Sequence, residues 1–340
     1  MPRIPLVLLA SLVWTAAATA APRYRIESVS GLPDPNAYGL ALNDLGQLVS
    51  GSVLWDRGAT TNLGLGTGTY AKDLNNRGQI VGYRNSRAFF WEAGVSTLMP
   101  NLGGQSGYAM AINEHGQAAG YTDNRESTSI LNYRATLWPT PAAAVDLGAM
   151  PGDNDSRAYA INDRGETACI SRPSTGSGFG QDLFLSSNGV VRAVIPDCGD
   201  DTVGGINNHG QIVGTHASRA FLWTDGALTL IGPASGSGSA RAINDAGQIV
   251  GRGDSTGAFL YDNGVLHALV DLVENREDWV LAVAADINEN GQIAGWATGA
   301  CSSSPRSRKR WTWSSRAPPP PMARPLRWAT APMPSSRAPA

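Results

Sequence analysis

Apolar and polar positions along the chain repeat around a short polar motif. The motif reads Asn-[Asp/Asn/Glu]-x-Gly-[Gln/Glu] and occurs seven times, beginning at Asn43, Asn75, Asn113, Asn162, Asn207, Asn244 and Asn288. An Ile or Leu precedes every copy, and small residues alternate with other residues before most copies, as at Ala109 and Ala111. Alternation with a period of two predicts a β-strand that leads into each motif.

The motif itself predicts a tight turn between two antiparallel strands. Asn is favoured at the first position of a type I turn, and Gly is favoured at the fourth, where φ is often positive. A run of β-forming residues follows the motif, such as Gln-Ile-Val-Gly at residues 211–214 and 248–251. Each copy is therefore expected to form a hairpin with a bulge.

Two further strands are expected in each repeat. An aromatic run follows the hairpin at residues 87–91, 134–138, 219–223 and 257–261, with weaker copies at 53–55 and 183–185. A second turn and a strand that ends near a Leu-Gly pair come next in several repeats. Four short strands in about 40 residues are typical of a propeller blade. We predict an all-β chain that forms a β-propeller of about seven four-stranded blades, with a β-solenoid as the alternative.

The two ends of the repeat region bear on how the ring closes. Residues 24–29 alternate like a fourth strand, so we expect them to complete the last blade and close the ring. After Gly295 the pattern stops, and no third strand follows the seventh turn. The last blade is therefore expected to be incomplete. Residues 300–340 are rich in Pro, Arg and Ser, which predicts a disordered tail or a frameshifted end of the coding region.

The first twenty residues have the pattern of a signal peptide. Arg3 precedes an apolar run at residues 4–13, and Ala18-Thr19-Ala20 offers small residues for cleavage before Ala21. The apolar run is too short for a transmembrane anchor. We expect a secreted, extracellular or periplasmic protein with a signal peptide at 1–20, a propeller at 21–299 and the tail at 300–340.

The repeat resembles a known family. The Ile-Asn-x-x-Gly-Gln-Ile-Val-Gly core and the Ala-Phe-Leu-Trp strand, seen at residues 243–251 and 220–223, are similar to those of the bacterial extracellular HAF repeat family. The similarity covers roughly residues 24–295. It implies a propeller-like exported protein and carries over no catalytic residue. The His for which the family is named is replaced here by Arg87, Arg134, Arg219 and Gly257.

Charge and cysteine content narrow the choice of partners. The formal net charge of −2 combines an acidic body with a tail that has no Asp or Glu. An acidic body is poorly suited to a phosphate backbone, so we expect no nucleic-acid partner. Cys169 and Cys198 fall in one repeat and could form a disulfide or remain free thiols, and Cys301 lies in the tail.

Candidate chemistry is sparse. Residues 253–257 match the GxSxG pattern but connect two predicted strands, whereas a nucleophile elbow needs a following helix. The histidines, His115, His209, His216 and His267, have no metal-ligand spacing. The second motif positions would form a circle of oxygens, Asp44, Asn76, Glu114, Asp163, Asn208, Asp245 and Glu289. This circle suggests weak Ca²⁺ or sugar binding, or simply the ordinary chemistry of turns.

These observations favour a non-catalytic binding scaffold. Variable loops at residues 122–132 and 173–181 would contact a polysaccharide or a surface protein. The alternative is a secreted carbohydrate-active enzyme, for which the irregular acidic residues are Asp153, Asp155, Asp197, Asp200 and Asp201. A third interpretation is a damaged gene product. We expect a monomer with no catalytic residue, no metal ligands and no cofactor beyond the calcium hypothesis, and the residues that bind the ligand are not identified.

Overall fold

The computed structural model describes residues 7–13, 22–34, 39–124, 133–173, 181–196, 198, 201–274 and 279–299. These residues form β-strands and one short 3₁₀ helix, η1 (Leu269–Leu272). The expected tail at 300–340 lies outside the described residues. No helix in the described part of the chain is long and apolar enough to cross a membrane.

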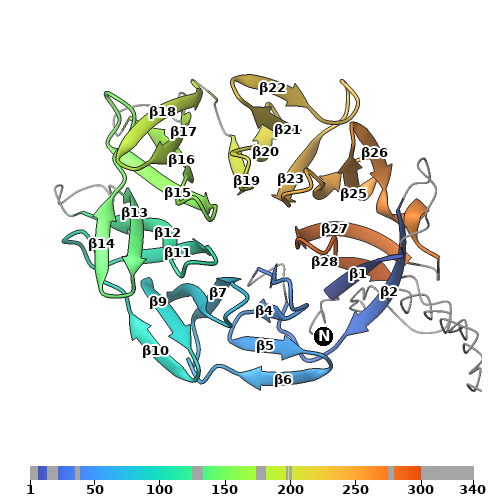
Figure 1. Ribbon diagram of the computed structural model, residues 1–340, viewed down its shortest axis with the longest axis horizontal. Coiled ribbons are helices and arrows are strands. Elements are labelled where there is room, and N and C mark those ends of the chain that lie inside the picture. The colour runs from blue at the N-terminus through green and yellow to red at the C-terminus, as the bar shows by residue number, and fades with distance from the viewer. Residues whose placement is uncertain are drawn as a thin grey trace, which may run out of the picture.

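The strands pair into seven four-stranded antiparallel sheets arranged around a central axis (Figure 1). The first three sheets contain β3 (Ala41–Leu42), β4 (Leu48–Ser50), β5 (Val53–Asp56) and β6 (Ala59–Asn62); β7 (Thr69–Leu74), β8 (Ile80–Arg84), β9 (Arg87–Glu92) and β10 (Val95–Leu98); and β11 (Gly107–Ile112), β12 (Ala118–Asp123), β13 (Tyr133–Thr140) and β14 (Ala143–Asp146).

The next three sheets contain β15 (Asp155–Ile161), β16 (Thr167–Arg172), β17 (Asp182–Ser187) and β18 (Val190–Ile195); β19 (Thr202–Ile206), β20 (Ile212–His216), β21 (Arg219–Thr224) and β22 (Ala227–Leu230); and β23 (Gly238–Ile243), β24 (Ile249–Gly253), β25 (Gly257–Asp262) and β26 (Val265–Ala268). The last sheet has the order β2 (Arg23–Val29), β1 (Val7–Val13), β28 (Ile293–Gly299) and β27 (Trp279–Ile287). The predicted β-propeller class is confirmed, and the solenoid alternative is wrong because the sheets surround one axis (Figure 1).

Each Asn motif forms the predicted hairpin turn between the first two strands of its sheet. In the first copy, the Gly46 N–H donates to the Asn43 carbonyl oxygen at 3.1 Å, and the Gln47 N–H donates to Asn43 Oδ1 at 2.9 Å. Gly46 has a φ of 77°, and the Gly of each other copy is also at positive φ. This left-handed conformation explains why Gly ends the turn.

A β-bulge recurs in the first strand of six sheets. The register with the second strand shifts between Ala71 and Asp73 in β7, and shifts at the corresponding place occur in β11, β15, β19, β23 and β27. Next to the bulge the two backbones come very close, and a Cβ at Gly214 would overlap with the carbonyl oxygen of Thr202. This close approach explains the Gly that ends the Gln-Ile-Val-Gly run.

Apolar side chains fill the space between neighbouring sheets. Phe90 and Met99 of one sheet pack with Ile112 and Trp138 of the next, and Trp138 is fully buried. Equivalent clusters join the other neighbouring sheets. Each sheet exposes an apolar face that only a neighbour can cover, so the ring buries its core between the blades.

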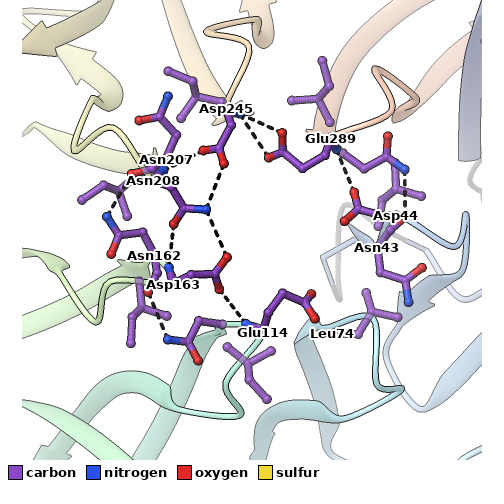
Figure 2. A pocket seen from close by; sticks show the side chains of 18 residues that line it. Asn43, Asp44, Leu74, Glu114, Asn162, Asp163, Asn207, Asn208, Asp245 and Glu289 are labelled. Carbon is purple, nitrogen blue, oxygen red and sulfur yellow. Dashed lines mark hydrogen bonds between the residues drawn. The ribbon is translucent and has the colours of Figure 1, made fainter.

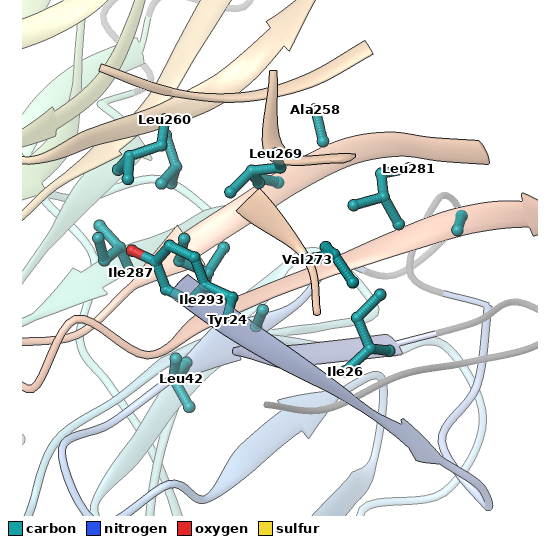
Figure 3. Packing of buried hydrophobic residues seen from close by; sticks show 14 of the residues in the cluster. Tyr24, Ile26, Leu42, Ala258, Leu260, Leu269, Val273, Leu281, Ile287 and Ile293 are labelled. Carbon is teal, nitrogen blue, oxygen red and sulfur yellow. The ribbon is translucent and has the colours of Figure 1, made fainter. Parts of the chain in front are cut away.

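The closing sheet combines strands from both ends of the chain. Tyr24 of β2 is fully buried and packs against Leu260, Leu269, Ile287 and Ile293 (Figure 3). The predicted role of residues 24–29 as the fourth strand is therefore confirmed. The same cluster includes Leu42, Leu48 and Trp55 of the first sheet, so it joins both neighbours of the closing sheet.

The third strand of the closing sheet is the difference from the sequence-based expectation. β1 pairs with β28 at Leu8↔Gly295 and Ala10↔Ile293 and with β2 along its whole length. β9 pairs with β8 in the same way at Phe89↔Gly82 and Trp91↔Ile80. Residues assigned to a signal peptide thus occupy the vacant third-strand position, so the sheet is complete and the propeller does not begin at residue 21 in this structure. Cleavage of residues 1–20 stays a prediction.

Candidate functional site

The Asn motifs of the seven sheets meet at one end of the central axis, where residues of six motifs and Leu74, which precedes the remaining one, line a cavity of about 260 Å³ (Figure 2). Each turn joins the two strands nearest the axis, so its polar side chains point toward the same space. The lining alternates apolar residues such as Leu42 and Leu74 with polar residues such as Asn43 and Asp44. The sequence-based prediction that the second motif positions form a circle is confirmed.

The second motif residues form a closed circle of hydrogen bonds. In each bond, the backbone N–H of one residue donates to the side-chain oxygen of its counterpart in the next sheet, over 2.7–3.1 Å. The order of residues is Asp44, Asn76, Glu114, Asp163, Asn208, Asp245, Glu289 and back to Asp44.

The first motif residues form a second closed circle. The Nδ2 of each Asn donates to the backbone carbonyl oxygen of the corresponding Asn in the next sheet, over 2.9–3.1 Å. These asparagines are buried, with at most 4% of each residue exposed. The two circles explain why each motif has an Asn followed by an acid or an amide. Both side chains join neighbouring blades through hydrogen bonds.

Amide groups separate some of the carboxylates in the circle of second motif residues, which we call the polar circle. Asn208 Nδ2 donates to both Asp163 and Asp245, at 3.0 and 2.9 Å, and Asn76 Nδ2 donates to Asp44 at 2.6 Å. Where no amide intervenes, burial and nearby carboxylates raise the pKa of Glu289 to about 7. Every residue of the circle thus accepts at least one hydrogen bond from a backbone or amide donor.

Two further carboxyl groups lie next to this circle, each two residues before a motif. Asp286 Oδ2 accepts the Leu42 N–H at 2.7 Å, and Asp73 Oδ2 accepts the Ile112 N–H at 2.8 Å. Burial is the main cause that raises the pKa of Asp73 to about 7 and that of Asp286 to about 8. The other repeats have Ala or Gly at this position, so these acids depart from the repeat and still link neighbouring sheets.

The described residues contain no group of three or more His, Cys, Asp or Glu side chains arranged to hold a metal ion. The acidic residues of the circle each accept a backbone N–H of a neighbouring sheet, as the turn-chemistry interpretation expects. Calcium binding stays a prediction that titration would test.

The opposite ends of the same strands carry a cluster of tyrosines that the sequence analysis did not identify. We call it the tyrosine face; its members are Tyr70, Tyr83, Tyr108, Tyr121, Tyr133 and Tyr159. Neighbouring ring centroids lie 4.9–6.2 Å apart in stacked, edge-on or tilted pairs. All six side chains are half-buried, so each keeps some surface open to solvent.

Cations lie over the rings of this face. The Lys72 Nζ is 6.0 Å from the Tyr70 ring centroid and 5.6 Å from that of Tyr83, and Arg157 Cζ is 5.3 Å from Tyr121 and 4.7 Å from Tyr133. All four distances are in the range of cation–π contacts. Burial lowers the pKa of Lys72 and raises that of Tyr83 and Tyr121.

The recurring bulge places variable residues on this side of the inner strands. Lys72, Tyr159 and Arg241 are the bulged residues of β7, β15 and β23. Arg241 lies 5.6 Å from the Trp296 ring, and the backbone of β23 around it packs closely against Gly204 of β19. Bulges re-aim side chains. The position three residues before each Asn motif varies between repeats, and this variation was the signal in the sequence that could have indicated this face.

The irregular acids predicted from the sequence do not form one cluster in the described residues. Asp155 pairs with Arg157 and Arg172 at 3.2 and 3.3 Å, and Asp201 Oδ2 lies 2.5 Å from His216 Nδ1. Ser171 donates to Asp153 at 2.5 Å. Asp197 and Asp200 lie outside the described residues, as do most residues of the loops 122–132 and 173–181.

The remaining sequence candidates have structural explanations. Residues 253–257 connect β24 to β25 in a hairpin, without the helix that a nucleophile elbow requires. Cys169 and Cys198 are buried free thiols, and burial raises the pKa of each to about 12. Cys301 lies outside the described residues.

Comparison with known proteins is limited to likeness of fold. No protein-family model and no curated protein matches the chain. Among solved structures, the β-propeller domain of the Trilobed protease from Pyrococcus furiosus is similar at 13% identity and a TM-score of 0.49, over 73% of this chain and 83% of that one.

A gluconolactonase from Xanthomonas campestris is similar at 13% identity and a TM-score of 0.42, over 78% of this chain and 96% of that one. A putative gluconolactonase is similar at 10% identity and a TM-score of 0.37, over 71% of this chain and 87% of that one. Likenesses at this level say nothing about activity. The chain is a β-propeller whose two ends differ, with a hydrogen-bonded polar circle at one and a tyrosine face at the other.

Proposed function

We propose that this chain is an exported, non-catalytic binding scaffold that holds a polysaccharide on its tyrosine face. The observation that supports the proposal is the cluster of six half-buried tyrosines with Lys72 and Arg157 over their rings. The signal-peptide pattern and the resemblance to the HAF repeat family support export.

The chemistry of a tyrosine cluster suits a sugar chain. A pyranose ring presents C–H groups on its faces and hydroxyl groups at its rim. A tyrosine offers an apolar ring for the first and a phenolic hydroxyl for the second. Several tyrosines side by side would contact several sugar units of one polysaccharide chain, whereas a single tyrosine would contact only one.

The described acidic groups favour binding over catalysis. Asp155 is neutralised by two arginines, Asp201 contacts His216, and the acids of the polar circle accept backbone N–H groups. A glycosidase would need two carboxyl groups facing a common space across the scissile bond. The paired acids described here are committed to other partners.

A panel of polysaccharides, with binding and product release measured in parallel, tests this proposal. Tyr108→Ala should weaken binding about tenfold, the equivalent of 1.4 kcal/mol, because Tyr108 contacts three other rings of the cluster. Tyr108→Phe keeps the ring and should lose less. Tyr261→Phe, in the sixth sheet, is the matched control and should bind as the unchanged protein does.

Two results would contradict the proposal. Absence of binding across the panel would remove the polysaccharide ligand. Product release that is lost in Asp200→Asn would favour the secreted carbohydrate-active enzyme instead.

A further inference from the structure

A pair of arginines without a carboxylate partner among the described residues lies in the sixth sheet, two sheets along the ring from the last tyrosine of the tyrosine face. Ser239 of β23 pairs with Arg252 of β24, and Arg241 is the bulged residue two positions further along β23. Both arginine side chains are exposed. No ion pair of Arg241 or Arg252 occurs among the described residues, although Arg134, Arg157, Arg164 and Arg172 all have one.

The two guanidinium groups are close enough to repel each other. Partial burial of its otherwise exposed side chain, and then the charge of Arg252, lower the pKa of Arg241 below its ordinary value. A nearby anion would relieve this repulsion, and a guanidinium can hold a carboxylate or sulfate through two parallel hydrogen bonds. The Trp296 ring beside Arg241 supplies an apolar surface next to the charges.

Lys72 adds a third cation of the same kind. It has no carboxylate partner among the described residues, and it lies over the rings of Tyr70 and Tyr83. Lys72 and Arg241 occupy equivalent bulge positions in their sheets. Arg157 differs from them, because Asp155 already neutralises it at 3.2 Å.

We infer that the polysaccharide held by the tyrosine face is an acidic one, whose carboxylate or sulfate groups pair with Arg241, Arg252 and Lys72 while its sugar rings lie on the aromatic side chains. This inference rests on the proposed function and names its ligand class. The net charge of the chain does not favour binding of an acidic polysaccharide, because the body of the chain is acidic and would repel such a polymer at long range. Recognition must come from these local cations.

The test uses the full chain with three probes: polygalacturonate for carboxylates, dextran sulfate for sulfates and neutral dextran. At least one acidic probe should bind about tenfold more tightly than dextran, with affinity that falls as salt is added. Which acidic probe binds decides between carboxylate and sulfate, and either result supports the inference.

Variants assign the binding to the named residues. Replacing both Arg241→Gln and Arg252→Gln should weaken binding of the acidic probe about tenfold. Arg192→Gln is the matched control, because Arg192 is also an exposed arginine over a Trp ring, 5.2 Å from Trp223, but on the outer strand β18. It should leave affinity within about twofold of the unchanged protein.

The inference and the proposed function fail in different ways. Equal binding of dextran and the acidic probes, unaffected by the double variant but weakened by Tyr108→Ala, overturns the inference and leaves the polysaccharide scaffold standing. An equal loss in Arg192→Gln also overturns it, because binding would then depend on charge alone. Absence of binding to all three probes and to the wider panel overturns both.

Discussion

The Nδ2 of Asn288 donates a hydrogen bond to the backbone carbonyl oxygen of Asn43 over 2.9 Å, although 245 positions separate the two residues. This bond joins the seventh motif to the first. It has the same geometry as the bonds between motifs that follow one another in the chain, such as Asn162 to Asn207 at 2.9 Å. The circle of asparagines is therefore continuous across the point where the ring closes.

Because the hydrogen bond at the ring closure has the same geometry as those within the chain, we expect the loss of either to lower the free energy of unfolding equally. Asn288→Ala and Asn162→Ala each remove a buried amide that contacts the next sheet and its own turn. Each should lower the free energy of unfolding by about 2–4 kcal/mol, because buried donors lose their partners. Chemical denaturation measures both losses. A negligible loss for Asn288→Ala beside a large one for Asn162→Ala would show that the ring is open.

The third strand of the closing sheet predicts the effect of removing residues 1–20. β1 lies between β2 and β28, so its loss exposes the edges of both strands and detaches β2 from its neighbour. The shortened chain should unfold more than about 5 °C below the full chain in a thermal melt. Removal of residues 1–6 alone keeps β1 and serves as the control. Equal melting temperatures for all three chains would contradict the role of β1 in the fold.

The raised pKa values predict how stability depends on pH. Asp73 and Asp286 have folded pKa values of about 7 and about 8, above their ordinary 3.8. Between these limits the folded chain keeps protons that the unfolded chain has released, so the free energy of unfolding falls as pH rises. The melting temperature should be higher near pH 5 than near pH 9.

Replacement of both acids tests their part in this dependence. A variant with Asp73→Asn and Asp286→Asn should show a flatter profile between the same two pH values. Glu289, whose folded pKa is about 7, keeps some slope of the same sign. A melting temperature that rises toward pH 9, or a pH dependence that is the same in the double variant, would refute the assignment of this dependence to Asp73 and Asp286.

The close approach of the first two strands predicts the effect of adding one methyl group. Gly214→Ala places a Cβ against the carbonyl oxygen of Thr202 and should destabilise the chain by about 2 kcal/mol or more. Gly205→Ala is the matched control in the same sheet. Its Cβ would meet neighbours at ordinary contact distances of 3.5 Å or more, and Ala occupies the same repeat position in β11 and β15. Similar losses in both variants would contradict the packing argument.

The local parts of this structure could be predicted from the sequence. The turn at each Asn motif depends on side-chain hydrogen bonds within five residues and on a Gly at positive φ, so Asn43 and Gly46 are sufficient to indicate it. The alternating strands and their aromatic residues also indicated blades that pack on one another. The circle of second motif residues followed from placing equivalent turns around an axis.

The tertiary structure decided what these residues contact. The side-chain oxygens of the polar circle accept backbone N–H groups of the preceding sheet, 32–49 positions away within the chain and 245 across the closure. Their local sequence looks the same whether they bind calcium or a backbone amide. The tyrosine face was missed for a similar reason, since its members come from strands of three different sheets.

The closing sheet shows most clearly which features the sequence determines and which depend on the tertiary structure. The sequence by itself determined seven turns, the strand at residues 24–29 and the absence of a third strand after Gly295, because turn chemistry and alternation are local properties. Only the tertiary structure decided that Val7–Val13 fills that vacancy. Strand pairing depends on an open edge and not on nearby sequence, so a segment with the pattern of a signal peptide can also pair as a strand between β2 and β28.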